Sequence, residues 1–307
     1  MKILVTGASG FVGSHLVREL SSRGHVVMAT AAGTFTADTA NVVLPCDITD
    51  REAVRRLVAE AQPEAVVHLA GISHVVEAGD EKSRLSHINI GGTENLCSAC
   101  TDELDGILFL FVSSAHVFRQ GQDEQQPIRE SSPLEPVNAY GQSKLAGEYI
   151  VRTHASASFR PWIVRPFNHI GPGQAPGFVC PSLARRIVDA EDGGTISVGN
   201  LNAFRDFTDV RDIVRAYRLI LEKRPRADLF VLGSGRALRI RDVLDEFIRI
   251  SGKSVEARVE TALLRENDPV KLEVDSGLAR RELGWECDIP MAQTLEDIYR
   301  DVSRNDR

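Results

Sequence analysis

The sequence predicts an α/β fold with a doubly wound parallel sheet and a smaller lobe in the C-terminal half. Short runs rich in β-branched residues alternate with longer amphipathic runs through the first half of the chain. Such an alternation implies right-handed crossovers between parallel strands. A glycine-rich turn follows the first run, and the regular alternation stops after Arg165-Pro166. These observations together predict a sheet of the Rossmann type.

Each predicted strand is a short apolar run rich in β-branched or aromatic residues. In chain order the predicted strands are Ile3–Thr6, Val26–Thr30, Val42–Leu44, Ala65–Leu69, Ile107–Val112, Trp162–Val164 and Phe230–Gly233. Each predicted helix has apolar residues at three- and four-residue spacing, which places them on one face. The predicted helices are Gly13–Ser22, Arg51–Glu60, Ser83–Cys100 and Ala139–Thr153.

Length and charge narrow the functional classes. The chain has 307 residues, with 36 Lys+Arg against 43 Asp+Glu and a formal net charge of −7. Binding of nucleic acid through the overall field needs the opposite sign, so we expect no nucleic-acid partner. No apolar run reaches the ~18 residues of a membrane span, and the first residues show no secretion signal. Five scattered cysteines suit neither a disulfide framework nor a metal site, so we expect a cytoplasmic protein without a metal.

Three glycines, Gly7, Gly10 and Gly13, lie between the first predicted strand and the helix that follows it. Glycine at this junction allows a tight turn, close approach of the backbone to a pyrophosphate, and close packing of helix on strand. The helix N-terminus would then hold the phosphates. A glycine-rich turn without a ligand is the alternative, but its place in the alternating pattern favours dinucleotide binding. We therefore expect the cofactor to contact these glycines together with Phe11 and Val12.

The end of the second predicted strand bears on the choice between NAD and NADP. A carboxylate there binds a free ribose, whereas an arginine binds a 2′-phosphate. The strand ends in Thr30-Ala31-Ala32, and no Lys or Arg occurs within Val26–Asp50. Because an unneutralised phosphate is less favourable than one missing hydrogen bond, the sequence favours NAD. Asp47 and Ile48 are expected at the adenine end, and a helix N-cap is the other role open to Asp47.

The change of composition after the predicted sheet divides the chain. A Gly/Pro-rich segment, Gly171–Gly177, follows the last regular strand and is typical of irregular structure. We predict a dinucleotide-binding domain over residues 1–166, with residues 203–233 returning to it. We predict a substrate-binding lobe over residues 167–202 and 234–307.

Tyr140 and Lys144 are four residues apart and therefore share one face of a predicted helix. A nearby cation favours phenolate and can bring the pKa of a tyrosine from about 10 towards neutral. Such a phenol can exchange a proton with a carbonyl or carbinol while hydride passes to or from a nicotinamide. Ser113 and Ser114 end a predicted strand, where side chains face the ligand crevice of a doubly wound sheet. A serine there can hold the same substrate oxygen as the tyrosine.

The order of these motifs resembles that of the extended short-chain dehydrogenase/reductase family, which includes NAD-dependent epimerases and dehydratases. The matching motifs are Gly7-x-x-Gly10-x-x-Gly13, His68-Leu69-Ala70-Gly71, Asn89-x-x-Gly92-Thr93-x-Asn95-Leu96, Ser113-Ser114-Ala115 and Tyr140-x-x-x-Lys144. The resemblance implies that Ser114, Tyr140 and Lys144 are catalytic. Tyr140 would be the acid/base, Ser114 would orient the substrate oxygen, and Lys144 would bind the cofactor ribose and lower the tyrosine pKa. It also implies a cofactor site that includes Leu69, Ala70, Gly71, Tyr140 and Lys144.

Within that family the second half resembles the GDP-4-keto-6-deoxy-D-mannose reductases and the related GDP-mannose 4,6-dehydratases. The matching segments are Arg165–Gln174, Val198–Leu201 and Arg205–Ile213. The resemblance implies that Asn168, Arg205 and Arg265 contact the diphosphate of a nucleotide sugar, and arginine can bind a phosphate with two hydrogen bonds. A salt bridge with Asp206 or Asp209 is the alternative for Arg205, and a structural role is the alternative for Arg265.

The residues after Ser114 bear on the reaction. By resemblance, Ala115 and His116 stand where 4,6-dehydratases typically carry an acidic pair, and alanine cannot transfer a proton. His116 is a candidate substrate contact with a suitable pKa, and a histidine facing solvent or a backbone group is its alternative. We expect NAD(P)H-dependent reduction of the 4-keto group of a GDP-4-keto-6-deoxyhexose. The alternatives are an NAD-dependent nucleotide-sugar 4-epimerase, a 4,6-dehydratase and a non-catalytic NAD(P)-sensing protein. Ser83–Cys100 and Ala139–Thr153 resemble the dimer helices of the family, so we expect a homodimer.

Overall fold

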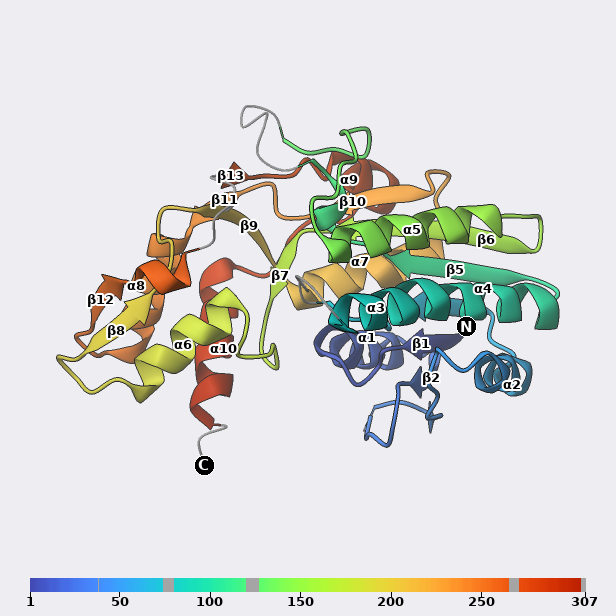
Figure 1. Ribbon diagram of the computed structural model, residues 1–307, viewed down its shortest axis with the longest axis horizontal. Helices are drawn as coiled ribbons and strands as arrows, with labels where there is room; N and C mark the ends of the chain where they lie inside the picture. The colour runs from blue at the N-terminus through green and yellow to red at the C-terminus, as the bar shows by residue number, and fades with distance from the viewer. Residues whose placement is uncertain (38, 74–79, 120–126, 265–270, 305–307) are drawn as a thin grey trace.

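A parallel sheet of seven strands forms the larger part of the protein (Figure 1). The computed structural model describes residues 1–37, 39–73, 80–119, 127–264 and 271–304. The strands lie in the order β10 (Leu229–Leu232), β6 (Phe159–Pro166), β5 (Ile107–Val112), β4 (Ala65–His68), β1 (Lys2–Thr6), β2 (Val26–Thr30) and β3 (Val42–Val43). All six pairings between them are parallel, which confirms the predicted α/β fold with a doubly wound sheet.

The strands are apolar on both sides because helices cover both faces of the sheet. Ile3 and Val5 of β1 belong to one core, and Leu4 between them belongs to the other. The first core is closed by α1 (Phe11–Ser22), α7 (Val210–Lys223) and α9 (Gly277–Leu283). The second core is closed by α2 (Arg51–Ala61), α4 (Gly92–Glu103) and α5 (Ala139–Thr153). Cys97 and Cys100 are unpaired residues of this second core.

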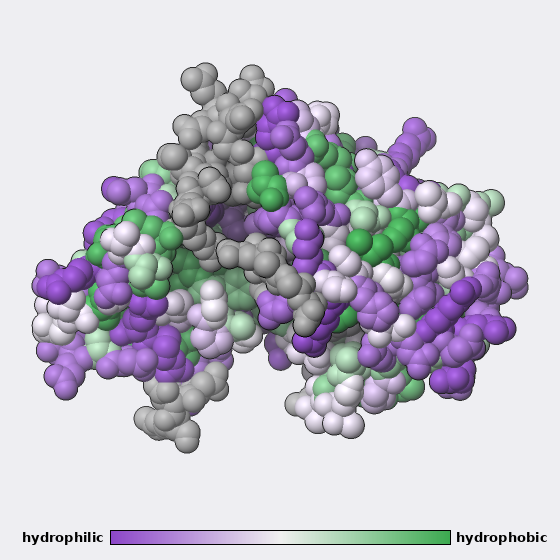
Figure 2. All heavy atoms as spheres, in the orientation of Figure 1, coloured by the Kyte–Doolittle hydropathy of each residue, from purple (hydrophilic) through white to green (hydrophobic). Residues whose placement is uncertain are grey.

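A smaller lobe with its own core lies beside the sheet (Figure 1). Its helices are α6 (Val179–Asp189), α8 (Ile240–Ser251) and α10 (Met291–Arg304). Its strands are β7 (Asn168–Ile170), β9 (Phe204–Asp209), β11 (Ala237–Arg239) and β13 (Lys271–Leu272) in one sheet, and β8 (Thr195–Val198) with β12 (Glu256–Val259) in another. Short 3₁₀ turns cover Ala115–Val117 and Thr261–Leu263. Figure 2 shows that the surface is hollowed where the lobe meets the main sheet.

The chain passes between these two parts more than once. Strand β9 lies in the smaller lobe, whereas α7 and β10, which follow it, belong to the main sheet and its cover. Leu229 of β10 pairs with Ile163 of β6, so β10 forms an edge of the sheet. In the described parts of the chain, no helix is long and apolar enough to span a membrane.

The predicted helix Ser83–Cys100 differs from the structure in its middle. The structure has α3 (Asp80–Ser86), a π-helical turn (His87–Gly91) and then α4. The apolar spacing is similar in both geometries, so periodicity cannot locate the wider turn. Such π-helical turns are frequent at functional sites.

Candidate active site

The glycine turn after β1 brings the backbone close to two neighbouring segments. Gly7 has φ +68°, and a Cβ there would lie 2.8 Å from the Ala70 nitrogen. A Cβ on Gly13 would lie 2.2 Å from the Gly7 carbonyl oxygen. Helix α1 begins at Phe11, with Gly10 as its N-cap, so its first amide groups face outward from the turn. This cradle of glycines at a helix N-terminus fits the pyrophosphate of a dinucleotide.

A chain of hydrogen bonds joins this turn to the loop that follows β4. The Thr6 hydroxyl accepts from the amides of Leu69 and Ala70, at 3.2 and 3.1 Å, and donates to His68 Nδ1 at 2.7 Å. His68 Nε2 donates to the Thr93 hydroxyl at 3.0 Å, because that hydroxyl donates its own proton to a backbone carbonyl of the π-helical turn. Burial lowers the pKa of His68 to about 3, so the ring is neutral. The predicted cofactor residues of both loops are thereby held side by side.

The residues expected at the adenine end are held from the other side by α4. A Cβ on Gly92 would lie 2.4 Å from Ile48 Cδ1, and the Asn95 amide donates to the Ile48 carbonyl at 3.0 Å. The exposed Asp47 accepts from the amide and hydroxyl of Thr49, which lowers its pKa. The N-cap of α2 is Asp50, so the helix-cap role considered for Asp47 is wrong.

Helix α5 is fixed tightly to the end of β5. Its N-cap is Asn138, whose side chain accepts from the Gly141 amide at 2.8 Å. A Cβ on Gly141 would lie 2.3 Å from the His116 carbonyl oxygen, and one on Gly147 would lie 2.5 Å from Phe111 Cζ. Both glycines therefore let the helix approach the strand end more closely than another residue would allow.

This contact brings the predicted catalytic residues together. Ser114 and Tyr140 are buried, and their side chains form a hydrogen bond that lowers the pKa of the phenol. Burial acts more strongly in the opposite direction, so the pKa of Tyr140 is raised. The expected lowering of this pKa is therefore not found in the protein alone. The phenol keeps its proton at neutral pH.

Lys144 lies one turn after Tyr140 and is also buried. Its Nζ donates to the Val112 carbonyl at 2.9 Å and lies 5.3 Å from the centre of the Phe111 ring. Burial lowers the pKa of Lys144 to about 8, and Glu148 opposes this shift. A Cβ on Gly71 would lie 3.8 Å from Nζ, which places the lysine beside a loop predicted to bind the cofactor.

Asn89 of the π-helical turn is buried beside this cluster and is not among the predicted site residues. Its side chain accepts from the Ile72 amide at 2.8 Å and donates to the Ile72 carbonyl at 3.1 Å. It also donates to the Ser143 hydroxyl, which itself donates to the Tyr140 carbonyl at 2.8 Å. Asn89 thus ties the cofactor loop to the helix that carries Tyr140. Its position in the motif Asn89-x-x-Gly92-Thr93-x-Asn95-Leu96 is the sequence feature that could have identified it as a site residue.

Ser113 has a different partner from Ser114. Its hydroxyl donates to Glu148 Oε1 at 2.5 Å, and Glu148 forms a two-pronged ion pair with Arg165. Glu148 is also not among the predicted site residues. It follows Tyr140 and Lys144 at four-residue spacing on one helix face, and this spacing could have identified it.

The residues predicted to bind the substrate lie nearby on several segments. Half-buried His116 stands with its ring 5.5 Å from that of Tyr140, and the Asn138 amide donates to its Nδ1 at 3.2 Å. Asn168 is exposed on β7, which pairs with β9, the strand of Arg205. Arg265 lies outside the described residues.

The acidic neighbours considered for Arg205 have other partners. Asp206 accepts from the Ser234 and Gly235 amides at 2.7 and 2.8 Å. Asp209 binds Arg211 with both carboxylate oxygens, at 2.9 and 2.7 Å.

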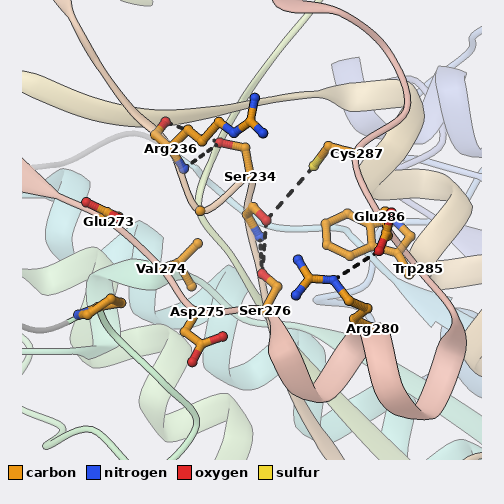
Figure 3. A pocket seen from close by; sticks show the side chains of 13 residues that line it. Ser234, Arg236, Glu273, Val274, Asp275, Ser276, Arg280, Trp285, Glu286 and Cys287 are labelled. Atoms are coloured by element: carbon orange, nitrogen blue, oxygen red, sulfur yellow. Dashed lines mark hydrogen bonds and ion pairs between the residues drawn. The ribbon is translucent and has the colours of Figure 1, made fainter.

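A cavity of about 340 Å³ lies at the carboxyl end of β10, against α9 (Figure 3). Charges of both signs surround it, and Arg280 forms an ion pair with Glu286 at 3.1 Å. None of the predicted site residues is among the described residues that line it. The described residues also contain no cluster of three His, Cys, Asp or Glu side chains that could hold a metal ion.

Comparison with known proteins shows the family of this chain. The profile of the NAD dependent epimerase/dehydratase family matches residues 3–233. GDP-6-deoxy-D-mannose reductase of Pseudomonas aeruginosa is 32% identical over 308 residues, which cover 98% of this chain and 96% of that protein. UDP-glucose 4-epimerase of Bacillus subtilis is 32% identical over 337 residues, which cover 99% and 98%.

A solved structure gives the same result in three dimensions. RMD from Pseudomonas aeruginosa, complexed with NADPH, matches with a TM-score of 0.85 and 29% identity over 99% of this chain and 100% of that one. Because the family profile spans most of its length and these relatives align from end to end, the chain belongs to the NAD dependent epimerase/dehydratase family, within the extended short-chain dehydrogenases/reductases.

Proposed function

We propose that the protein reduces the 4-keto group of a GDP-4-keto-6-deoxyhexose with NAD(P)H. The convergence of Ser114, Tyr140 and Lys144 at the end of β5, beside the glycine turn, carries this proposal. The similarity to a GDP-6-deoxy-D-mannose reductase supports the choice of substrate.

In this reaction Tyr140 donates its phenolic proton to the ketone oxygen. The raised pKa of Tyr140 supports this direction, because the acid form is the one present before reduction. Ser114 donates a hydrogen bond to the same oxygen and orients it. Lys144 places a positive charge near the phenol and stabilises the phenolate that remains. The dinucleotide, when bound at Gly7, Gly10 and Gly13, supplies the hydride.

We assign the nucleotide-sugar diphosphate to Asn168, Arg205 and Arg265, with His116 beside the sugar. The guanidinium group can bind phosphate oxygens with two hydrogen bonds, which favours arginine in this role. Arg205→Met is expected to raise KM for the sugar nucleotide with a smaller effect on kcat. An unchanged KM would indicate a structural role for Arg205 instead of substrate binding.

For the cofactor we propose a preference for NAD(H). Support comes from the absence of Lys and Arg within Val26–Asp50, where a cation would pair with a 2′-phosphate. RMD of Pseudomonas aeruginosa was solved in complex with NADPH, which favours NADP(H) as the cofactor of that protein. Kd values for NADH and NADPH, measured by fluorescence titration, decide between them. Tighter binding of NADPH would refute the preference.

The reductase activity is tested with purified protein, a GDP-4-keto-6-deoxyhexose and NADH or NADPH. We expect loss of NAD(P)H absorbance in a one-to-one ratio with formation of the 6-deoxyhexose product. Tyr140→Phe is the matched control, since it removes only the proton donor. A folded preparation that binds NAD(P)H but leaves it unchanged in the presence of this substrate would exclude the reductase.

A nucleotide-sugar 4-epimerase is the second candidate, because a UDP-glucose 4-epimerase of Bacillus subtilis is equally identical to this chain. An epimerase first removes a proton from the C4 hydroxyl and therefore needs phenolate at the start. Interconversion of two 4-epimers without net change in the cofactor would support this candidate.

We further propose a homodimer formed through α4 and α5. Tyr149 on α5 is 62% exposed, so this helix presents an aromatic side chain to solvent that an interface could bury.

A further inference from the structure

An ion pair between Glu148 on α5 and Arg165 on β6 is buried behind the candidate catalytic residues. Arg165 Nε and Nη2 donate to Glu148 Oε1 and Oε2 at 2.9 and 2.7 Å. The two side chains are only 2% and 3% exposed. Both charges have therefore lost their water, and each depends on the other for compensation.

The same carboxylate holds the end of β5. The Ser113 hydroxyl donates to Glu148 Oε1 at 2.5 Å, and Ser113 is directly followed by Ser114. On the opposite side Arg165 lies over the Phe118 ring at 5.0 Å, which fixes the guanidinium plane. Glu148 is thus anchored from β6 and in turn anchors the strand end that carries the candidate catalytic serine.

Three consecutive residues of β5 and its end are held by three consecutive turns of α5. The Val112 carbonyl accepts from Lys144, the Ser113 hydroxyl donates to Glu148, and Ser114 bonds with Tyr140. The positions of the serine and of the lysine therefore both depend on how closely α5 lies against the end of β5.

We propose that the Glu148–Arg165 pair is a positioning unit that orients Ser114 through Ser113 and keeps Lys144 positively charged. Its kinetic part rests on the proposed function. Its electrostatic part concerns the protein alone and can be measured without substrate.

The charges around Lys144 support the second half of this proposal. Tyr140 on the same helix is neutral at pH 7, and so is His68 from β4. Burial lowers the pKa of Lys144 to about 8, and the negative charge of Glu148 limits this lowering. Arg165 faces Glu148 from β6 and compensates its charge.

Three variants separate the effect of the Ser113 hydrogen bond from the effects of the Glu148 and Arg165 charges. Ser113→Ala removes the hydrogen bond and leaves the ion pair. Glu148→Gln keeps an acceptor for Ser113 and removes the negative charge. Because a lone buried Arg165 can prevent folding, the double variant Glu148→Gln/Arg165→Met removes both charges together.

A matched control is the ion pair of Arg218 with Glu19 on the other face of the sheet. Arg218 is 9% exposed and donates to Glu19 at 2.7 Å. The side chains of Arg218 and Glu19 are 11% and 20% exposed, and Arg218 also pairs with Glu222. Arg218→Met therefore disrupts a partly buried ion pair that has no contact with the candidate catalytic residues.

The first measurement is the titration of Lys144 by NMR of protein labelled at the lysine ε-carbon. The chain has six lysines, and Lys144→Met identifies the resonance of interest. We expect the pKa of Lys144 to fall by about one unit in Glu148→Gln, which leaves Arg165 uncompensated, and by less in the double variant, which removes both charges. It should stay unchanged in Ser113→Ala and in Arg218→Met.

The second measurement is kcat and its pH profile. Ser113→Ala should lower kcat about tenfold without moving the alkaline limb, because a small misplacement of a reacting group is sufficient for such a loss. Glu148→Gln should move the alkaline limb to lower pH. Wild-type kcat in Ser113→Ala, or a wild-type Lys144 titration in both Glu148 variants, would overturn the proposal. If the wild-type protein has no reductase activity but Lys144 titrates as expected, the proposed function fails and the electrostatic role stands.

Discussion

Tyr140 is the residue through which the proposed proton transfer runs, and its neighbour Tyr149 on the same helix provides an internal comparison. Tyr140→Phe removes the proton donor and is expected to lower kcat by about 10²–10⁴-fold. Tyr149→Phe, at an exposed position, should leave kcat unchanged. Steady-state kinetics and thermal unfolding of both variants check this, since Tyr140→Phe should remain folded. Equal activity of the two variants would contradict the role of Tyr140.

Lys144 links the site to the stability of the protein. Its pKa falls from the ordinary 10.5 to about 8 on folding, so between these values the unfolded chain binds more protons than the folded one. Its contribution to the free energy of unfolding should therefore rise as the pH rises through this window, by up to about 3 kcal/mol. Other groups titrate there too, so the measured quantity is the difference between wild type and Lys144→Met in urea unfolding across that range. A difference that does not change with pH would refute the lowered pKa.

At the scale of elements, the approach of α5 to the end of β5 determines where Tyr140 lies. Gly141→Ala would place a Cβ 2.3 Å from the His116 carbonyl oxygen, a backbone atom that cannot move freely. We expect a loss of about 1–3 kcal/mol in the free energy of unfolding and a lower kcat, because the helix start must shift. Gly177→Ala is the control, since a Cβ there meets no atom within 4 Å. Chemical denaturation of both variants tests this, and equal stabilities would show that the helix can adapt.

The helices and strands differ in how well the sequence predicts them. The strand Val26–Thr30 and the helix Ala139–Thr153 have the predicted bounds, because strong local patterns define them. The π-helical turn at His87–Gly91 was not predicted, since it depends on contacts of Asn89 with Ile72 and Ser143. The three-residue strands β7 and β11 were also missed, because their pairing with β9 joins distant parts of the chain.

The same distinction applies to the candidate site. Ser114 could be expected in the ligand crevice because it follows the carboxyl end of a parallel strand, and its meeting with Tyr140 could be expected from the order of the motifs. The buried ion pair of Glu148 with Arg165 could not be predicted. Charged residues are rarely buried unless they are paired, and the sequence does not show which distant residue is the partner. The pKa of Tyr140 was mispredicted for a related reason, since burial depends on the complete fold. The individual roles of these residues stay predictions.

At the scale of the whole molecule, the proposed homodimer sets the mass in solution. The chain has a mass of 33.7 kDa, so light scattering after gel filtration should give twice this value. Tyr149→Glu should shift the mass towards that of one chain, because a charge on the exposed face of α5 opposes burial in an interface. Asp189→Asn, at the end of α6, is a control that should leave the mass unchanged. A single-chain mass for the unmodified protein would contradict the proposal.

Strand β6 remains an unpaired edge during synthesis until Leu229–Leu232 has left the ribosome. Its residues Trp162 and Val164 are buried in the finished sheet, and an exposed apolar edge of this kind promotes intermolecular pairing. We therefore expect the nascent chain to be prone to aggregation after residues 1–166 are synthesised and until β10 is added. A fragment that ends at Arg224 is expected to form soluble aggregates or precipitate, whereas the full chain does not. Light scattering of the two during refolding tests this, and a monomeric fragment would show that α7 protects the edge.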